Sequence, residues 1–279
     1  MRGTVVDNKT GELLEEVVYY TNEERERYRQ YLEQKKEYEY KGAMINSEYN
    51  KHGCFTWLIY HSQQVLDLGI TPDQLTKLIY LSTFIDYNNR LMIDKDKHMT
   101  REDMQEVLKV RERTFKTFWS AMIKTKILIV DSYNKSLYLN ESLFRRGAIE
   151  INEDENKIRL YYKGVRALYE KAKLTEHKFL SYLFQAIPFI NRDYNIISHN
   201  PFESDIELVQ PMQMSEYCRI INYDYDNARK LKGKMKALTV NGKHVFSFVD
   251  NGNGLFCFVN PLVYYAGNRW DEVEVLAKF

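Results

Sequence analysis

The chain has 279 residues and a mass of 33.4 kDa, which fits two medium-sized domains or one domain with appendages. Its hydrophobic fraction of 44% can build a real core, and no apolar run reaches the roughly 18 residues that a membrane-spanning helix needs. The net charge of +1 would, taken as an average, argue against a nucleic-acid partner.

Cysteine usage and the first residues of the chain predict where the protein works. Three cysteines lie far apart and are odd in number, which favours a reducing compartment over a disulfide framework. The N-terminal residues lack the apolar stretch of a signal peptide. We therefore expect a cytoplasmic protein with no membrane contact.

Motifs that carry catalysis are missing from the sequence. No glycine-rich phosphate loop and no dinucleotide-binding fingerprint occurs among the 12 glycines. The six histidines include no pair at metal-ligand spacing, and no serine lies in a nucleophile elbow. The sequence therefore predicts a protein that is not an enzyme and that needs neither a cofactor nor a metal.

Residues 1–50 form the first expected segment. Thr4–Asp7 and Glu12–Tyr20 predict the two strands of a hairpin, and the charged residues 22–41 predict a helix with regularly spaced tyrosines. Two interpretations of this helix stay open. It is either a solvated spacer or an arm for dimerisation or partner docking, because tyrosine is favoured at interfaces.

Residues 51–150 follow as a series of short elements. Phe55–Tyr60 predicts a strand, and Thr71 with Pro72 predicts the start of a helix that runs to about Ile85. The further elements in chain order are a strand at Arg90–Ile93, a brief helix opened by Thr100 and Asp103 and ending at Leu108, a break at Lys109–Arg111, a longer helix over Glu112–Lys124, and strands at Lys126–Asp131 and Leu137–Leu139.

Residues 151–279 predict the same series again. In chain order we expect a strand at Ile158–Tyr162, a helix at Thr175–Ile190, a strand at Tyr194–Ser198, a short helix at Ser215–Ile221, a break at Asn222–Asp224, a helix from there to about Ala237, and a hairpin of Val245–Val249 with Leu255–Val259. The turn of this hairpin is expected at 250–254, where asparagine and glycine tolerate positive φ.

Two sequence patterns support a duplication. The spacing of apolar residues and asparagine in 78–89 recurs in 180–191, 102 positions later, and the closing pattern of 139–147 recurs in 259–267, 120 positions later. Each unit reads as helix, strand, helix, short turn, helix and hairpin. The sequence therefore predicts an α+β, mainly α, protein of two tandem winged helix-turn-helix domains, 51–150 and 151–279, behind an N-terminal extension of 1–50.

The third helix of each unit repeats an apolar stripe. Phe115, Phe118 and Met122 in the first copy correspond to Ala228, Leu231 and Met235 in the second, all at an offset of 113. Such a stripe is typical of a buried helix face. We expect these residues in the core.

Positive charge gathers on the same two helices. Residues 109–126 carry six basic side chains and one acidic one, a net of +5, and residues 224–243 carry six and two, a net of +4. The remaining 241 residues therefore hold −8. Segregation of this kind predicts a phosphate-binding surface.

The exposed faces of the two helices supply the candidate DNA-binding residues. In the first unit they are Arg111, Arg113, Thr114, Lys116, Thr117, Ser120 and Lys124, with Lys135 in the hairpin turn. In the second unit they are Asn227, Arg229, Lys230, Lys232, Lys234, Lys236 and Lys243, and Gly233 would let a backbone approach. Arginine can pair with guanine and asparagine with adenine, whereas lysine mostly neutralises phosphate.

The series from Phe55 to Gly147, closed by the pattern Leu137-Tyr-Leu-Asn140 and Phe144, resembles the winged-helix domain of RepL-type replication proteins of Firmicute plasmids. It is also similar to MarR-like and phage-borne winged-helix regulators. The resemblance covers about a third of the chain and implies a phage or plasmid protein that recognises duplex DNA. A doubled unit departs from the single-domain members and implies two unlike half-sites.

Three functions stay open on the sequence. The first is a transcription regulator that reads a bipartite duplex site, and the second is a replication initiator that binds origin repeats. The third is an interaction scaffold that docks a host factor such as RNA polymerase. The expected partners are double-stranded DNA, a second copy of the chain, or a host replication or transcription protein.

Overall fold

A computed structural model describes residues 2–18, 21–36, 53–61, 68–150, 155–250 and 255–267 of the chain. Its contacts form two compact units, Met1–Asn50 and Lys51–Phe279. In the first unit, β1 (Arg2–Val6) and β2 (Leu13–Val18) pair as the hairpin that the sequence predicts, and a helix covers residues 22–36. Residues 37–41 of the predicted helix lie outside the described ranges.

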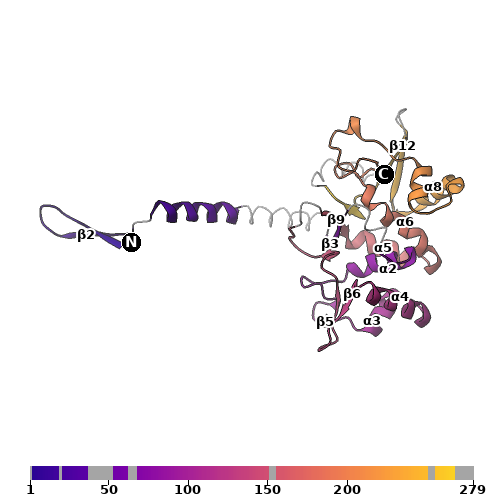
Figure 1. Ribbon diagram of the computed structural model, residues 1–279, viewed down its shortest axis with the longest axis horizontal. Coiled ribbons are helices and arrows are strands. Elements are labelled where there is room, and N and C mark those ends of the chain that lie inside the picture. The colour runs from indigo at the N-terminus through magenta and orange to yellow at the C-terminus, as the bar shows by residue number, and fades with distance from the viewer. Residues whose placement is uncertain are drawn as a thin grey trace. The chain divides into compact units, whose positions relative to one another are not determined.

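A four-stranded antiparallel sheet lies midway between the two ends of the second unit, on its left side in Figure 1. Its strands, in spatial order, are β14 (Tyr264–Tyr265), β9 (Asn156–Tyr161), β3 (Phe55–Tyr60) and β8 (Phe144–Arg145). All six residues of β3 are buried. The strand therefore needs cover on both faces and a partner on each edge, and β9 and β8 supply the partners.

The expected fold, a mainly α tandem of two winged helix-turn-helix domains, is wrong. The second unit is an α/β structure in which β3, from the first repeat, pairs along its whole length with β9, from the second. Small two-stranded hairpins surround this shared sheet. The reason is physical: β3 is buried along its whole length and β9 over its last four residues, and the backbone N–H and C=O groups of buried strands must be hydrogen-bonded. Each strand does so by pairing with the other.

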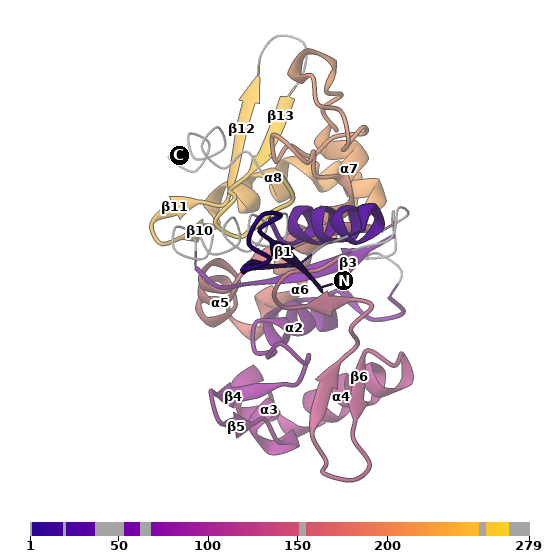
Figure 2. The same ribbon diagram turned by 90° about the vertical axis from the view of Figure 1, so that its left-hand side faces the viewer.

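Three helices pack beside the sheet: α2 (Pro72–Ser82), α5 (Tyr162–Lys171) and α6 (His177–Gln185). Figure 2 shows α2 and α6 side by side from a second direction. Thr71 caps α2 in a capping box with Gln74, which confirms the predicted start. The helix ends at Ser82, earlier than expected.

Helix α5, which follows β9 in the second repeat, was not predicted from the sequence. Arg166 of α5 donates hydrogen bonds to the carbonyl oxygen of Thr83 at 2.6 Å and to its hydroxyl at 2.9 Å. Its guanidinium lies 4.1 Å from the centre of the Phe84 ring. A cation at a helix C-terminus offsets the negative end of the helix dipole. Arg166 therefore stabilises the end of α2 from the other half of the unit.

The contact between α2 and α6 is polar as well as apolar. The Thr76 hydroxyl donates to the His177 carbonyl at 2.7 Å, and the Tyr80 ring stacks on Tyr169 of α5 at 3.8 Å. The Tyr169 hydroxyl donates to the carbonyl of Leu108. One hydrophobic cluster contains buried residues from both repeats, so the halves share a core.

The outer elements flank this centre. In the first repeat they are β4 (Met92–Asp94), β5 (Lys97–His98), α3 (Arg101–Leu108), α4 (Glu112–Lys124), β6 (Leu128–Val130) and β7 (Leu137–Leu139). In the second they are α7 (Met214–Ile220), α8 (Ala228–Ala237), β10 (Thr239–Val240), β11 (Lys243–His244), β12 (Phe246–Asp250) and β13 (Leu255–Val259). The capping box of Thr100 and Asp103 and the bounds of α4, β7 and β13 agree with the prediction. The strand predicted at Tyr194–Ser198 is instead a set of isolated bridges.

The predicted apolar stripes are confirmed as core. Phe115, Phe118 and Met122 each expose about 1% of their surface, and Leu231 and Met235 are equally buried. The last stripe position, Ala228, is half-buried. The helices α4 and α8 therefore turn equivalent faces inward.

Replacing Phe115 by alanine is expected to lower the free energy of unfolding by about 3–5 kcal/mol, because it removes a buried ring and leaves a cavity. Chemical denaturation measures the loss. The matched control is Phe202→Ala, since Phe202 is 66% exposed. Equal effects of the two substitutions would contradict the inward orientation of α4.

Two helical glycines provide a second test with one chemical change. A Cβ at Gly164 would lie 2.1 Å from the carbonyl oxygen of Leu262, whereas a Cβ at Gly233 would meet nothing within 4 Å. Gly164→Ala should destabilise by roughly 1–3 kcal/mol through overpacking. Gly233→Ala should stabilise by up to about 1 kcal/mol through helix propensity. Thermal and chemical unfolding of both variants measure the difference in sign.

His177 predicts a pH dependence of stability. The side chain is 1% exposed, and burial, followed by the charge of Lys77, lowers its pKa to about 4. The unfolded chain binds a proton below about pH 6.5 that the folded chain does not, so this contribution is full above pH 6.5 and is lost as the pH falls towards 4. His177→Phe should flatten the fall in unfolding free energy between pH 7 and 5.5 relative to the exposed control His244→Phe. Equal slopes in both variants would contradict a neutral buried imidazole.

Candidate nucleic-acid interface

The first basic segment, residues 109–126, begins with the tight turn that joins α3 to α4. Lys109 ends α3 in the left-handed conformation, with φ of 51°, and its N–H donates to the Glu106 carbonyl at 3.0 Å. Val110 is buried, and α4 begins at Glu112. The turn therefore anchors the start of α4 in the core and leaves its basic face outward.

The second basic segment is built in the same way. Asn222 has φ of 53° after α7, and its N–H donates to the Arg219 carbonyl at 3.3 Å. Asn222 lies 113 positions after Lys109, the offset that also relates the two apolar stripes. A short 3-10 turn, Tyr225–Asn227, then leads into α8. The predicted breaks at 109–111 and 222–224 are thus confirmed as equivalent turns.

The predicted residues on α4 are all exposed. Lys116 forms an ion pair with Glu112 at 2.7 Å, and its hydrogen bond lowers the pKa of that carboxyl. The Thr117 hydroxyl donates to the Arg113 carbonyl within the helix. Ser120 also lies on α4. Arg111 is the N-cap residue of this helix, and Lys124 lies in its last turn.

A shallow hollow of about 280 Å³ lies beside the first half of α4. Arg113, Thr114 and Thr117 border it from α4, and the first residues of α2 border it from the other side. Polar side chains of two helices therefore converge next to the basic face.

On α8, Arg229, Lys230, Lys234 and Lys236 are exposed, and Lys232 is half-buried. The ammonium groups of Lys232 and Lys236 lie 5.0 and 5.7 Å from the centre of the Phe248 ring in β12. These cation–π contacts hold the two lysines against the hairpin. Because nothing lies near the Cβ direction of Gly233, the helix surface stays open there.

Asn227 has an intramolecular partner. Its side-chain amide donates to the Asp224 carboxylate at 2.6 Å, so a contact with adenine would require that bond to be exchanged. Lys243 is exposed in β11. Of the turn predicted at 250–254, Asp250 is the last residue of β12, and residues 251–254 lie outside the described ranges.

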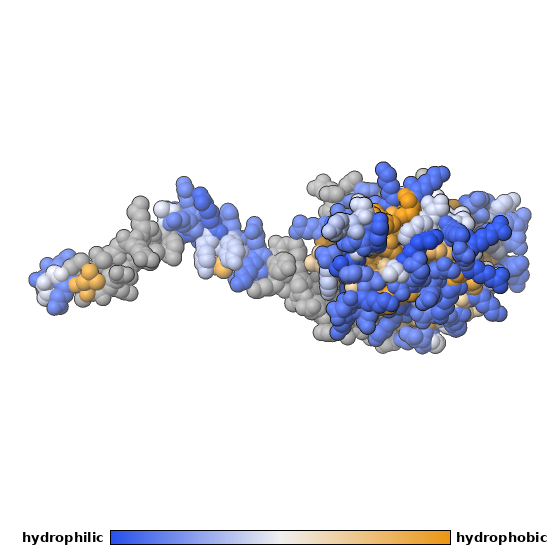
Figure 3. All heavy atoms as spheres, turned by 90° about the horizontal axis from the view of Figure 1, so that it is seen from below, coloured by the Kyte–Doolittle hydropathy of each residue, from blue (hydrophilic) through white to orange (hydrophobic). Residues whose placement is uncertain are grey.

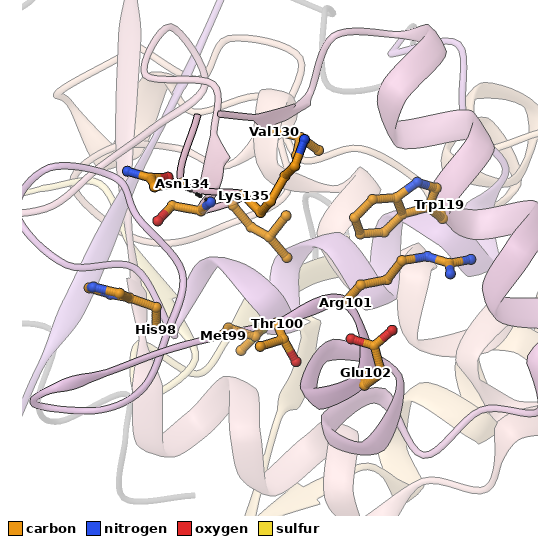
Figure 4. A pocket seen from close by; sticks show the side chains of 11 residues that line it. His98, Met99, Thr100, Arg101, Glu102, Trp119, Val130, Asn134 and Lys135 are labelled. Atoms are coloured by element: carbon orange, nitrogen blue, oxygen red, sulfur yellow. Dashed lines mark hydrogen bonds between the residues drawn. The ribbon is translucent and has the colours of Figure 1, made fainter. Parts of the chain in front are cut away.

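Arg101 is a functional candidate that the sequence analysis missed. It is the first residue of α3, and its guanidinium lies 5.2 Å from the centre of the Trp119 ring and 5.5 Å from that of Phe115. Figure 4 shows Arg101 and Trp119 together on one side of an open hollow of about 390 Å³, with Asn134 and Lys135 of the β6–β7 turn also lining it. The sequence signal for this residue was a basic side chain at the start of a predicted helix. It lies outside residues 109–126, the segment whose net charge is +5.

The two basic helices lie on one side of the second unit. In Figure 1, α4 and α8 both occupy the right-hand side of this unit, and the sheet strands β3 and β9 lie on the left of the helices that pack against it. Figure 3 shows a largely hydrophilic surface from below. The segments 109–126 and 224–243 thus bring net charges of +5 and +4 to the same side.

Metal sites and membrane-spanning helices were sought in the described residues. Within these ranges, histidine, cysteine, aspartate and glutamate form no group of three that could hold a metal ion. None of the helices in the same ranges combines the length and apolar character needed to cross a membrane. Comparisons of the chain with protein-family models, with curated proteins and with solved structures found no match.

Proposed function

We propose that the chain is a sequence-specific duplex-DNA-binding protein of a phage or plasmid that regulates transcription from a bipartite site. The observation that carries the proposal is the equivalent placement of two basic helices, α4 and α8, on one side of one unit. Each helix buries its apolar stripe and exposes its arginines and lysines.

Both the shape and the charge of the two helices suit duplex DNA. An exposed helix of this kind fits the major groove of B-DNA, where side chains near its N-terminus reach base edges and flanking basic residues reach phosphates. Two segments of net +5 and +4 on one side repel each other, and a polyanion offsets that repulsion. Arg113 and Arg229 are the residues best suited to guanine, since arginine pairs with it in a bidentate manner.

A second candidate is a replication initiator at a phage or plasmid origin. Two reading helices in a single chain favour it, because one molecule can then occupy a composite site without forming a dimer first. Plasmid maintenance separates the two roles. Replication that depends on this gene and on its bound site in cis would favour the initiator, whereas a change in transcription alone would favour the regulator.

The third candidate, a scaffold that docks a host protein, differs from both in its response to salt. Contacts with several phosphates make the binding constant fall steeply as salt rises, with a log–log slope of about −0.9 per contact. A complex with protein that is insensitive to salt, together with no binding to DNA, would favour the scaffold.

Replacing Arg229 and Lys230 together by alanine tests the DNA-binding proposal. We expect weaker binding to specific and random duplex and a salt slope smaller in magnitude by about two, because two phosphate contacts are removed. Electrophoretic shifts and fluorescence anisotropy over a series of salt concentrations measure both quantities.

The matched control removes the same charge elsewhere. Arg27 and Arg29 lie on the exposed helix of residues 22–36 in the first unit, and their double alanine variant should leave the slope unchanged. An unaltered shift with the α8 variant at moderate salt, or an equal loss with the control, would argue against α8 as a DNA contact.

A further inference from the structure

The two repeats are related by an approximate two-fold axis and not by a translation. In the antiparallel pairing of β3 with β9, Trp57 lies directly opposite Arg159. These residues are 102 positions apart, the offset at which the pattern of α2 recurs in α6. Equivalent residues that face each other across an antiparallel pair mark the position of a two-fold axis.

The edge strands obey the same symmetry. Leu58 pairs with Phe144 on one edge, and Leu160 pairs with Tyr264 on the other. Leu160 follows Leu58 by 102 positions, and Tyr264 follows Phe144 by 120, which are the two offsets of the sequence repeat.

Two hydrogen bonds at the axis are also equivalent. The indole N–H of Trp57 donates to the Gly147 carbonyl at 2.8 Å, and the Nη1 of Arg159 donates to the Gly267 carbonyl at 2.8 Å. Gly147 and Gly267 are the closing glycines of the two sequence patterns. The axis therefore relates the closing segments as well as the strands.

The basic helices follow this axis. Figure 2 looks nearly along it, and half a turn about the centre of the unit carries α8 to the position of α4, α7 to that of α3, and the β12–β13 hairpin to that of β6–β7. In Figure 1 the axis runs across the page and leaves the unit between α4 and α8. The two helices are thus presented to a ligand in opposite directions.

We infer that α4 and α8 read two half-sites of inverted polarity, arranged about a dyad as in a palindrome, although their bases differ. This inference rests on the proposed binding of duplex DNA. The DNA backbone has two-fold axes perpendicular to its length. When one of these axes coincides with the two-fold axis of the unit, both helices meet phosphates in the same geometry. Half-sites in direct repeat would present the second groove in the wrong direction.

A helix-face graft makes the polarity measurable. The offset of 113 aligns Asp226, Asn227, Arg229, Lys230 and Gly233 of the second segment with Arg113, Thr114, Lys116, Thr117 and Ser120 of the first. The full chain with Asp226→Arg, Asn227→Thr, Arg229→Lys, Lys230→Thr and Gly233→Ser keeps the buried positions and carries one reading surface twice. Selection from random duplex oligonucleotides then reports the arrangement of two like half-sites.

We expect the graft to select an inverted repeat of one half-site of the wild-type sequence and to bind it at least tenfold more tightly than the direct repeat. Preference for the direct repeat would overturn the inference. The reciprocal graft places the α8 surface on α4 and is used if the first graft does not fold. Its substitutions are Arg113→Asp, Thr114→Asn, Lys116→Arg, Thr117→Lys and Ser120→Gly. It should select an inverted repeat of the other half-site.

Selection with the wild-type chain distinguishes a failure of the proposed DNA binding from a failure of the inferred half-site polarity. Enrichment of no sequence, with no salt-dependent binding to random duplex, would refute the proposed function itself. Enrichment of two unlike half-sites with wild type, followed by direct repeats with both grafts, would refute the polarity alone.

Discussion

Trp57 and Arg159 face each other at the middle of the β3–β9 pair, where both side chains are buried. The guanidinium lies 4.5 Å from the centre of the indole ring and donates to the Gly267 carbonyl. A buried cation is costly unless it is hydrogen-bonded, so these contacts constrain which backbone segment can lie beside the strand. The indole imposes a similar constraint through Gly147. The sheet order follows from this pair, because each member holds the closing segment of its own repeat.

This central pair also determines where the charge of the unit lies. It brings α2 against α6 in a shared core, and each repeat then mounts its helical pair on an equivalent left-handed turn, at Lys109 and at Asn222. Two strongly basic segments consequently lie on one side, although self-repulsion disfavours that arrangement in the absence of a polyanion. A local feature, the outward basic face of a helix, becomes a bipartite surface only through the pairing of two strands far away from it.

The asparagines of the closing patterns have a structural role. The side-chain amide of Asn140 donates to the Lys126 carbonyl, and that of Asn260 donates to the His244 carbonyl. Each bond ties the closing segment to the residue two positions before the first strand of the neighbouring hairpin. The repeated asparagines therefore hold the backbone of each closing segment in place. The exposed faces of α4 and α8, in contrast, carry different side chains in the two repeats. This division explains how the two halves can share a scaffold and still present different side chains on their exposed helices.

The sequence by itself determined the local features of the molecule. Helix caps such as Thr71 and Thr100, the apolar stripe of Phe115, Phe118 and Met122, and the charge of 109–126 and 224–243 depend on residues a few positions apart, and their period is visible in the chain. Only the tertiary structure decided that the strands β3 and β9 pair with each other, that α5 caps α2, that Arg101 joins Trp119, and that the repeats form one α/β unit in place of two domains. The apolar side chains of β3 indicate that this strand is buried, but they do not indicate its partner. The partner depends on contacts between residues about a hundred positions apart, and no local pattern encodes the energy of those contacts.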